Sequence, residues 1–240
     1  MAVRTVIQRG PKGKKFAAFA IDWPGWSRGA KAPDAAVELL EAYRERYRPI
    51  VRLAGLEAEF DRAGDLEIVE DHVGVGSTDF WGISFAPSSF ELAPMPEDEL
   101  ERKLGLLEAS WWFFDQVAAR VSLELEKGPR GGGRDRDQIV RHVVGNEWVD
   151  LARKVGVLTP PDDVLTPAGI RSHRDDFVAA MRDYNSQGKL ARGRNWTIPL
   201  LLRHACFHVL DHAWEMEDKD LSEAQSPAAT ESARGSAPPS

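Results

Sequence analysis

The stretch LLLRHACFHVLDHAWE, residues 200–215, carries three of the six histidines of the chain within nine residues. No glycine or proline interrupts residues 200–225, so one helix can run through the whole cluster. With 3.6 residues per turn, His204, His208 and His212 lie along one side of that helix. The stretch therefore predicts the last core helix of a bundle, and the rest of the chain is interpreted as its support.

The spacing of these histidines is typical of a metal site, because two imidazoles at i and i+4 can bind one ion. A helical projection places His208 and His212 on the apolar side, whereas His204 lies at the polar boundary, where it can reach water. Buried imidazoles need partners for both ring nitrogens, and two charged rings one turn apart repel each other. A bound cation satisfies both rings, so His208 and His212 are predicted ligands of Zn, Ni, Fe or Cu.

A third ligand has two candidates on the helix expected at about residues 135–154, namely His142 and Glu147. Five residues separate them by about 140° around a helix, so a regular helix cannot direct both at one ion. Spacing alone leaves the choice between them open. His173 is expected at the surface of the next helix, and His72 in a loop of the N-terminal half.

Composition limits the class of protein. Hydrophobic residues make up 42% and charged residues 29% of the 240 residues, which is typical of a soluble globular protein. The net charge of −7 argues against a nucleic-acid platform, although it leaves room for a local basic patch. The single cysteine, Cys206, fits a reducing compartment. No signal peptide and no apolar run of roughly 20 residues is present, so we expect a cytoplasmic protein without a membrane partner.

Residues 1–90 predict a small α+β unit, a sheet with one helix. Alternating apolar residues indicate strands at 3–7 and 16–21 that form a hairpin, followed by a helix over 33–47. Two further strands are expected at 66–70 and 80–85, around a glycine-rich segment at 72–76. The Gly-x-Gly of that segment favours a turn over a phosphate-binding loop, because no Lys or helix start follows it.

The remaining sequence predicts an all-α domain over residues 91–219, after a Pro/Ser-rich boundary at 86–96. Amphipathic helices are expected at about 97–127, 135–154, 168–184 and 197–218. Four such helices within about 120 residues predict a four-helix bundle. Residues 220–240 contain few large apolar side chains and are predicted to form a disordered tail.

Two parts of the chain resemble known families. IVRHVVGNE (139–147) and LLRHACFHVLDHAWEMED (201–218) together look like the DinB-like metal-binding four-helix bundle, over about residues 97–219. That family places one His on its second helix and His-x-x-x-His on its fourth. The resemblance therefore implies His142, His208 and His212 as the ligands, in preference to Glu147, and leaves His204 out. Residues 20–47, with a Pro-Gly corner and an acidic, Ala-rich helix, resemble the HicB-like antitoxin fold.

The DinB-like resemblance implies a divalent ion, zinc or nickel, and a transferase or isomerase that uses a low-molecular-weight thiol such as mycothiol or bacillithiol. A cation lowers the pKa of such a thiol and favours the nucleophilic thiolate. The thiol and a small-molecule substrate would then be the partners. The alternative is a non-enzymatic binding or regulatory protein, in which the metal is structural or absent and residues 1–90 recognise a partner protein.

Other side chains are assigned secondary roles. Asp211 and Glu215 flank the ligands and could orient an imidazole, with Asp211 the more solvated of the two. Arg192 and Arg194 are interpreted as solvated loop residues rather than an anion site. The run WWFF, residues 111–114, makes its helix apolar on more than one side, which predicts a homodimer.

Overall fold

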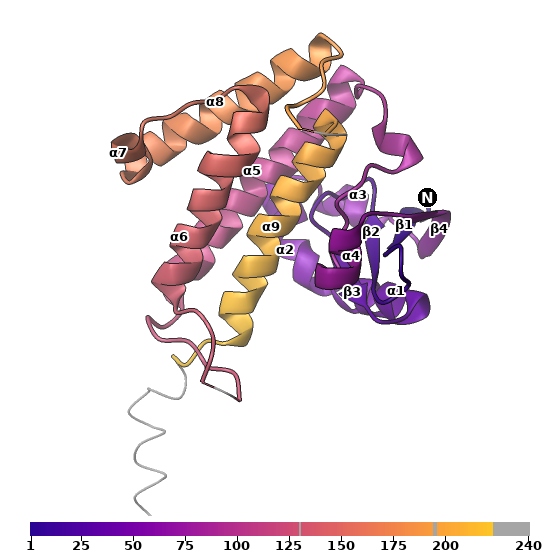
Figure 1. The fold of residues 1–240 in the computed structure, drawn as a ribbon, viewed down its shortest axis with the longest axis horizontal. Helices are drawn as coiled ribbons and strands as arrows, with labels where there is room; N and C mark the ends of the chain where they lie inside the picture. The colour runs from indigo at the N-terminus through magenta and orange to yellow at the C-terminus, as the bar shows by residue number, and fades with distance from the viewer. Residues whose placement is uncertain (130, 194–195, 223–240) are drawn as a thin grey trace, which may run out of the picture.

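The computed structural model describes residues 1–129, 131–193 and 196–222 of the chain. A four-stranded sheet with short helices forms the N-terminal part, and mostly helices follow it, so the fold is broadly α+β (Figure 1). This architecture confirms the sequence prediction at that level. The division at residue 90 stays a prediction, and the expected disordered tail lies outside the described residues from 223 onward.

The sheet has the strand order β3-β2-β1-β4. Its strands are β1 (Val3–Arg9), β2 (Phe16–Ala20), β3 (Ser27–Ala30) and β4 (Leu66–Val73). β1 and β2 form the predicted antiparallel hairpin, with Ile7 opposite Ala18, and β4 runs parallel to β1 on its other side. β3 was not predicted, because its sequence SRGA lacks the β-branched and aromatic residues that signal a strand.

The helices of the N-terminal part differ in two places from those expected. The predicted single helix is divided into α1 (Pro33–Ala42) and α2 (Arg44–Leu53), and the short α3 (Glu57–Asp61) follows. The strand expected at 80–85 is wrong, since residues Gly76–Trp81 form helix α4 instead. This helix ends at Gly82, whose φ of 74° is a left-handed conformation that glycine adopts without strain.

The later helices occur in the predicted order. They are η1 (Ser89–Glu91), α5 (Glu97–Arg120), α6 (Arg136–Asn146), the π turn η2 (Glu147–Leu151), η3 (Ala152–Val155), α7 (Pro161–Val164), α8 (Pro167–Ser186) and α9 (Ile198–Asp218). Figure 1 shows α5, α6 and α9 running side by side, while α8 crosses near one end of them. The α-helical part of the expected 135–154 helix ends at Asn146, where the backbone changes to a π turn.

One hydrophobic core connects the sheet side of the molecule to α5 and α9. It includes Trp23 and Trp26 from the N-terminal part together with Leu104 of α5 and Leu210 of α9. Gly25 shows how close the two parts lie, because a Cβ at this position would be 2.7 Å from Leu210 Cδ1. Its φ of 92° also favours glycine. The N-terminal part therefore covers one side of α9.

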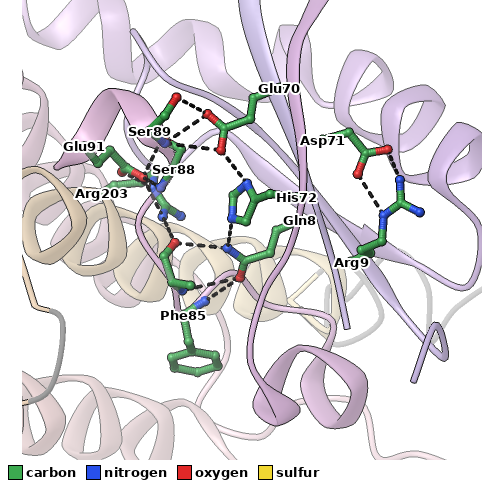
Figure 2. A network of polar contacts seen from close by, with 11 residues as sticks. Gln8, Arg9, Glu70, Asp71, His72, Phe85, Ser88, Ser89, Glu91 and Arg203 are labelled. Carbon is green, nitrogen blue, oxygen red and sulfur yellow. Dashed lines mark hydrogen bonds and ion pairs between the residues drawn. The ribbon is translucent and has the colours of Figure 1, made fainter. Parts of the chain in front are cut away.

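A buried ion pair joins α9 to the segment before α5. Arg203 Nε donates to Glu91 Oε1 at 2.5 Å, and their side chains are only 5% and 4% exposed (Figure 2). Glu91 also accepts from the backbone N–H and the hydroxyl of Ser88, both at 2.9 Å. Burial alone would raise the pKa of Glu91, but the charge of Arg203 and these hydrogen bonds hold it below its ordinary value.

The same network continues into the sheet (Figure 2). The buried Gln8 amide lies 2.7 Å from His72 Nε2, and His72 Nδ1 lies 2.7 Å from Glu70 Oε1. Glu70 in turn accepts from the backbone N–H of Ser89 at 2.9 Å. The expectation that His72 is a loop residue is wrong, because β4 extends to Val73 in register with β1. The ring of His72 thus contacts Gln8 through Nε2, and its Nδ1 lies beside the Glu70 carboxylate.

Removing the cation of the buried pair should destabilise the fold. We expect Arg203→Met to lower the free energy of unfolding by about 3–5 kcal/mol, because it leaves the Glu91 carboxylate buried without its counter-charge. The matched control is Arg182→Met, which breaks the exposed pair with Glu101 and should cost at most about 1 kcal/mol. Urea unfolding, monitored by circular dichroism, measures the loss of stability in both variants. Equal losses in the two variants would contradict this role for Arg203.

Candidate metal centre

Three histidines from two neighbouring helices converge. His142 comes from α6, and His208 and His212 come from α9. Each offers a ring nitrogen that lies within 4.8 Å of those of the other two. The Nε2 atoms of His142 and His208 are 3.3 Å apart, and the ring centroids of His142 and His212 are 4.9 Å apart. The structure thus brings the three predicted ligands together in one cluster.

The spacing of these nitrogens suits a small cation. Two nitrogens that each lie 2.0–2.1 Å from a tetrahedral zinc are about 3.3 Å from each other, and the His142–His208 pair already has this separation. The cluster is also open on one side, since His142 is exposed, His208 is half-buried and His212 is 9% exposed. An ion held between the rings would therefore be accessible to solvent from the side of His142.

The electrostatic surroundings favour neutral imidazoles. Burial, followed by the charge of His212, lowers the pKa of His208 to about 2. The pKa of His142 is also lowered, first by burial and then by the same neighbour. Neutral imidazole is the form that binds metals, because the ligating nitrogen must carry a free lone pair. Both rings are thus in the ligating form at neutral pH.

A carboxylate orients the third ring. The Nδ1 of His212 donates to Glu215 Oε2 at 2.7 Å, which leaves Nε2 for an ion, and Glu215 Oε1 accepts from Lys219 at 2.6 Å. The hydrogen bond from His212 is the main reason that the pKa of Glu215 falls to about 2. Such carboxylate–histidine contacts fix the tautomer of metal-binding imidazoles. Of the two acids considered from the sequence, Glu215 therefore takes the orienting position.

Asp211 points to the other side of α9. It is partly exposed, as expected, and also accepts from Arg28 Nη1 of β3 at 2.9 Å. The Arg28 guanidinium stacks on the rings of Tyr43 and Trp214, with its central carbon 3.6 Å and 4.3 Å from their centroids. These contacts fasten the N-terminal part to the turn of α9 that carries His212.

Glu147 does not belong to the histidine cluster. It lies in the π turn that follows α6 and is buried, with Oε1 3.4 Å from Arg174 Nε and 3.9 Å from His173 Nε2. Burial raises the pKa of this carboxyl despite the nearby Arg174. Of the two candidates on this stretch, the structure places His142 beside His208 and His212.

Two other histidines are buried where exposure was expected. His204 lies between the rings of Phe85 and Trp196, at centroid distances of 4.9 Å and 5.5 Å. His173 is fully buried, and its Nδ1 is 2.7 Å from Thr159 Oγ1. Both expectations are wrong for one reason: the covering residues lie outside the helix that carries each histidine, so the helical projection could not include them.

The remaining assignments concern surface side chains. Arg192 is exposed, as expected for a solvated residue, whereas Arg194 lies outside the described residues. In the WWFF run, Trp112 is 53% exposed and the other three side chains are buried. The homodimer predicted from this run stays a prediction that now depends on Trp112.

No protein-family model, no curated protein and no solved structure matches this chain. The DinB-like and HicB-like resemblances therefore stay predictions from the sequence. Among the described residues, no helix combines the length and the apolar character that crossing a membrane requires.

The burial of His204 should make stability depend on pH. Burial and the charge of Arg203 lower the pKa of His204 to about 4, so between about pH 6.5 and pH 4 the unfolded chain binds a proton that the folded chain does not. Stability therefore falls as the pH falls through this window. We expect His204→Phe to reduce the loss between pH 7 and pH 5 by roughly 1–2 kcal/mol.

Urea unfolding at the two pH values, with a chelator present throughout, measures this difference. The ring of Phe fits the aromatic surroundings of His204, so the variant is expected to fold. An unchanged pH dependence in His204→Phe would show that the neutral state of this ring is not what makes acid destabilising.

Proposed function

We propose that the chain binds one divalent transition-metal ion, zinc or nickel, through His142, His208 and His212, and acts as a metal-dependent transferase for a low-molecular-weight thiol. The main support for this metal site is that three imidazoles from α6 and α9 converge in one cluster. The thiol chemistry rests on the DinB-like resemblance. The order of α5, α6, α8 and α9 supports a DinB-like four-helix bundle as the scaffold of this site.

The open side of the cluster favours a catalytic over a purely structural site. Within the described parts of the chain, the cluster consists of three histidines and has no fourth protein ligand. Structural zinc sites are usually closed by four protein ligands, whereas catalytic sites have three and one exchangeable position. The exposure of His142 supports access of a small molecule to that position.

Each residue of the cluster would have its own role in holding the ion. His142 and His208 supply neutral nitrogen donors, and Glu215 holds His212 with its Nε2 toward the cluster. A divalent cation bound there supplies a Lewis acid that lowers the pKa of a thiol, so that more of it is thiolate near neutral pH. The thiolate would then attack an electrophilic carbon of the second substrate, so that a C–S bond forms while the bond from that carbon to its leaving group breaks. The leaving group departs with the electron pair, and the proton of the thiol goes to solvent.

Arg134 is a candidate for binding an anionic group of the substrate. It is half-buried just before α6, the helix that carries His142, and its charge lowers the pKa of both His142 and His208. In the described residues it forms neither an ion pair nor a side-chain hydrogen bond, unlike Arg136, which pairs with Asp137. A guanidinium in this position suits a carboxylate on the thiol or on its acceptor.

Replacing the three ligands should abolish metal binding. We expect the wild-type protein, loaded with zinc or nickel and desalted, to retain about one ion per chain, and the triple variant His142→Ala/His208→Ala/His212→Ala to retain none, because one-site coordination needs these donors. Elemental analysis by mass spectrometry measures the ratio. The control is His204→Phe, which leaves the cluster intact. A metal content unaffected by the triple change would refute the site.

Removing the charge that orients His212 should weaken binding without abolishing it. We expect Glu215→Gln to raise the dissociation constant for zinc by about 10–100-fold, the usual effect of losing such a contact. Asp218→Asn, an exposed acid on the same helix, should leave the constant unchanged. Competition with a chromophoric chelator measures both variants.

The transferase itself is tested by conjugation of a thiol to an electrophile with metal-loaded and metal-free protein. Turnover that requires the ion supports the enzyme. Tight metal binding without turnover for any thiol, combined with four protein ligands around the ion, would favour the non-enzymatic alternative.

A further inference from the structure

Two aromatic side chains of α4 are exposed to solvent next to each other. Phe80 is 67% and Trp81 is 62% exposed, and their rings are 4.5 Å apart at an angle of 79°. Neither ring is needed to hold α4 in place. The helix is fastened by its other side, where Thr78 is buried and donates to Gln8. The aromatic pair is therefore available to a partner.

Basic side chains surround this pair. The β1–β2 hairpin presents Lys12 and Lys14 to solvent, and their backbone N–H groups donate to the carboxylate of Asp79 at 2.7 Å and 2.8 Å. Lys15 donates to the carbonyl of Phe80 at 2.7 Å. The register of β2 with β3, in which Phe16 faces Ala30, places Lys31 beside Lys15 at the same end of the sheet.

The charge of this surface is opposite to that of the chain as a whole. The net charge is −7, yet four lysines gather here, and in the part of the chain that the structure describes none of their ammonium groups pairs with an acid. The carboxylate of Asp79 is turned toward the backbone of the hairpin. A partner that contacts the aromatic pair would thus meet an excess of positive charge.

We infer that Phe80, Trp81, Lys12, Lys14, Lys15 and Lys31 form a surface that docks the protein onto an anionic lipid membrane. Protruding aromatic side chains partition into the interfacial region of a bilayer, and lysines around them are attracted to anionic headgroups. The sequence alone predicted no membrane partner. That expectation rested on the lack of an apolar run long enough to span a bilayer, which docking at its surface does not need. The strand predicted separately at 80–85 would have buried alternate side chains, whereas α4 exposes both rings.

A single strand of nucleic acid fits this surface less well. Such strands bind where successive bases stack on aromatic faces along a groove. The rings of Phe80 and Trp81 are nearly perpendicular, so they do not form one continuous stacking platform. Insertion into a lipid interface needs only that the rings protrude.

Sedimentation of the full-length protein with vesicles tests the inference. We expect it to bind vesicles of phosphatidylcholine mixed with phosphatidylserine, and to bind pure phosphatidylcholine much more weakly. Phe80→Ala/Trp81→Ala should abolish most of the binding. Lys12→Gln/Lys14→Gln should lower the partition coefficient about 25-fold, because each lysine near an anionic surface contributes about fivefold.

The matched control is Trp112→Ala, which removes an exposed tryptophan from α5 and should leave vesicle binding unchanged. Circular dichroism shows whether each variant is folded, and only folded variants are compared. The inference is overturned if the wild-type protein does not bind the anionic vesicles, or if the two patch variants bind as the wild type does. Binding to single-stranded DNA without binding to vesicles would also overturn it and assign the surface to nucleic acid.

Discussion

The burial of α9 on almost every side is the constraint on which the rest of the structure depends. A polar side chain on such a helix is costly unless a neighbour satisfies it. Arg203 is paired with Glu91, and His212 is held by Glu215. His208 differs, because its polar neighbour is another imidazole, that of His142. On the face of α9 toward α6, therefore, imidazole nitrogens gather that could hold a metal ion.

His142 lies within α6, whereas Glu147 lies just beyond the end of that helix. The backbone changes to a π turn at Glu147, and π turns are frequent at functional sites. Glu147 is buried near Arg174 and does not join the histidine cluster. The sequence offered Glu147 and His142 as alternative third ligands. In the structure they belong to separate polar clusters: Glu147 is buried beside α8, and His142 lies in the open cluster with α9.

The sequence predicts what depends on local periodicity. The i, i+4 spacing identified His208 and His212, and the apolar pattern placed the last helix almost to the residue, since both follow from the pitch of one helix. It could not predict β3, whose four small and polar residues become a strand only by pairing with β2. It also failed for His204, which is covered by Phe85 and Trp196 from outside its helix.

A crystal structure of the metal-loaded protein, with anomalous data collected at the absorption edge of the added ion, tests the central claim most directly. We expect one anomalous peak about 2.0–2.2 Å from a ring nitrogen of each of His142, His208 and His212, with a non-protein ligand on the side of His142. A peak elsewhere, or the absence of a peak between these three rings, would contradict it.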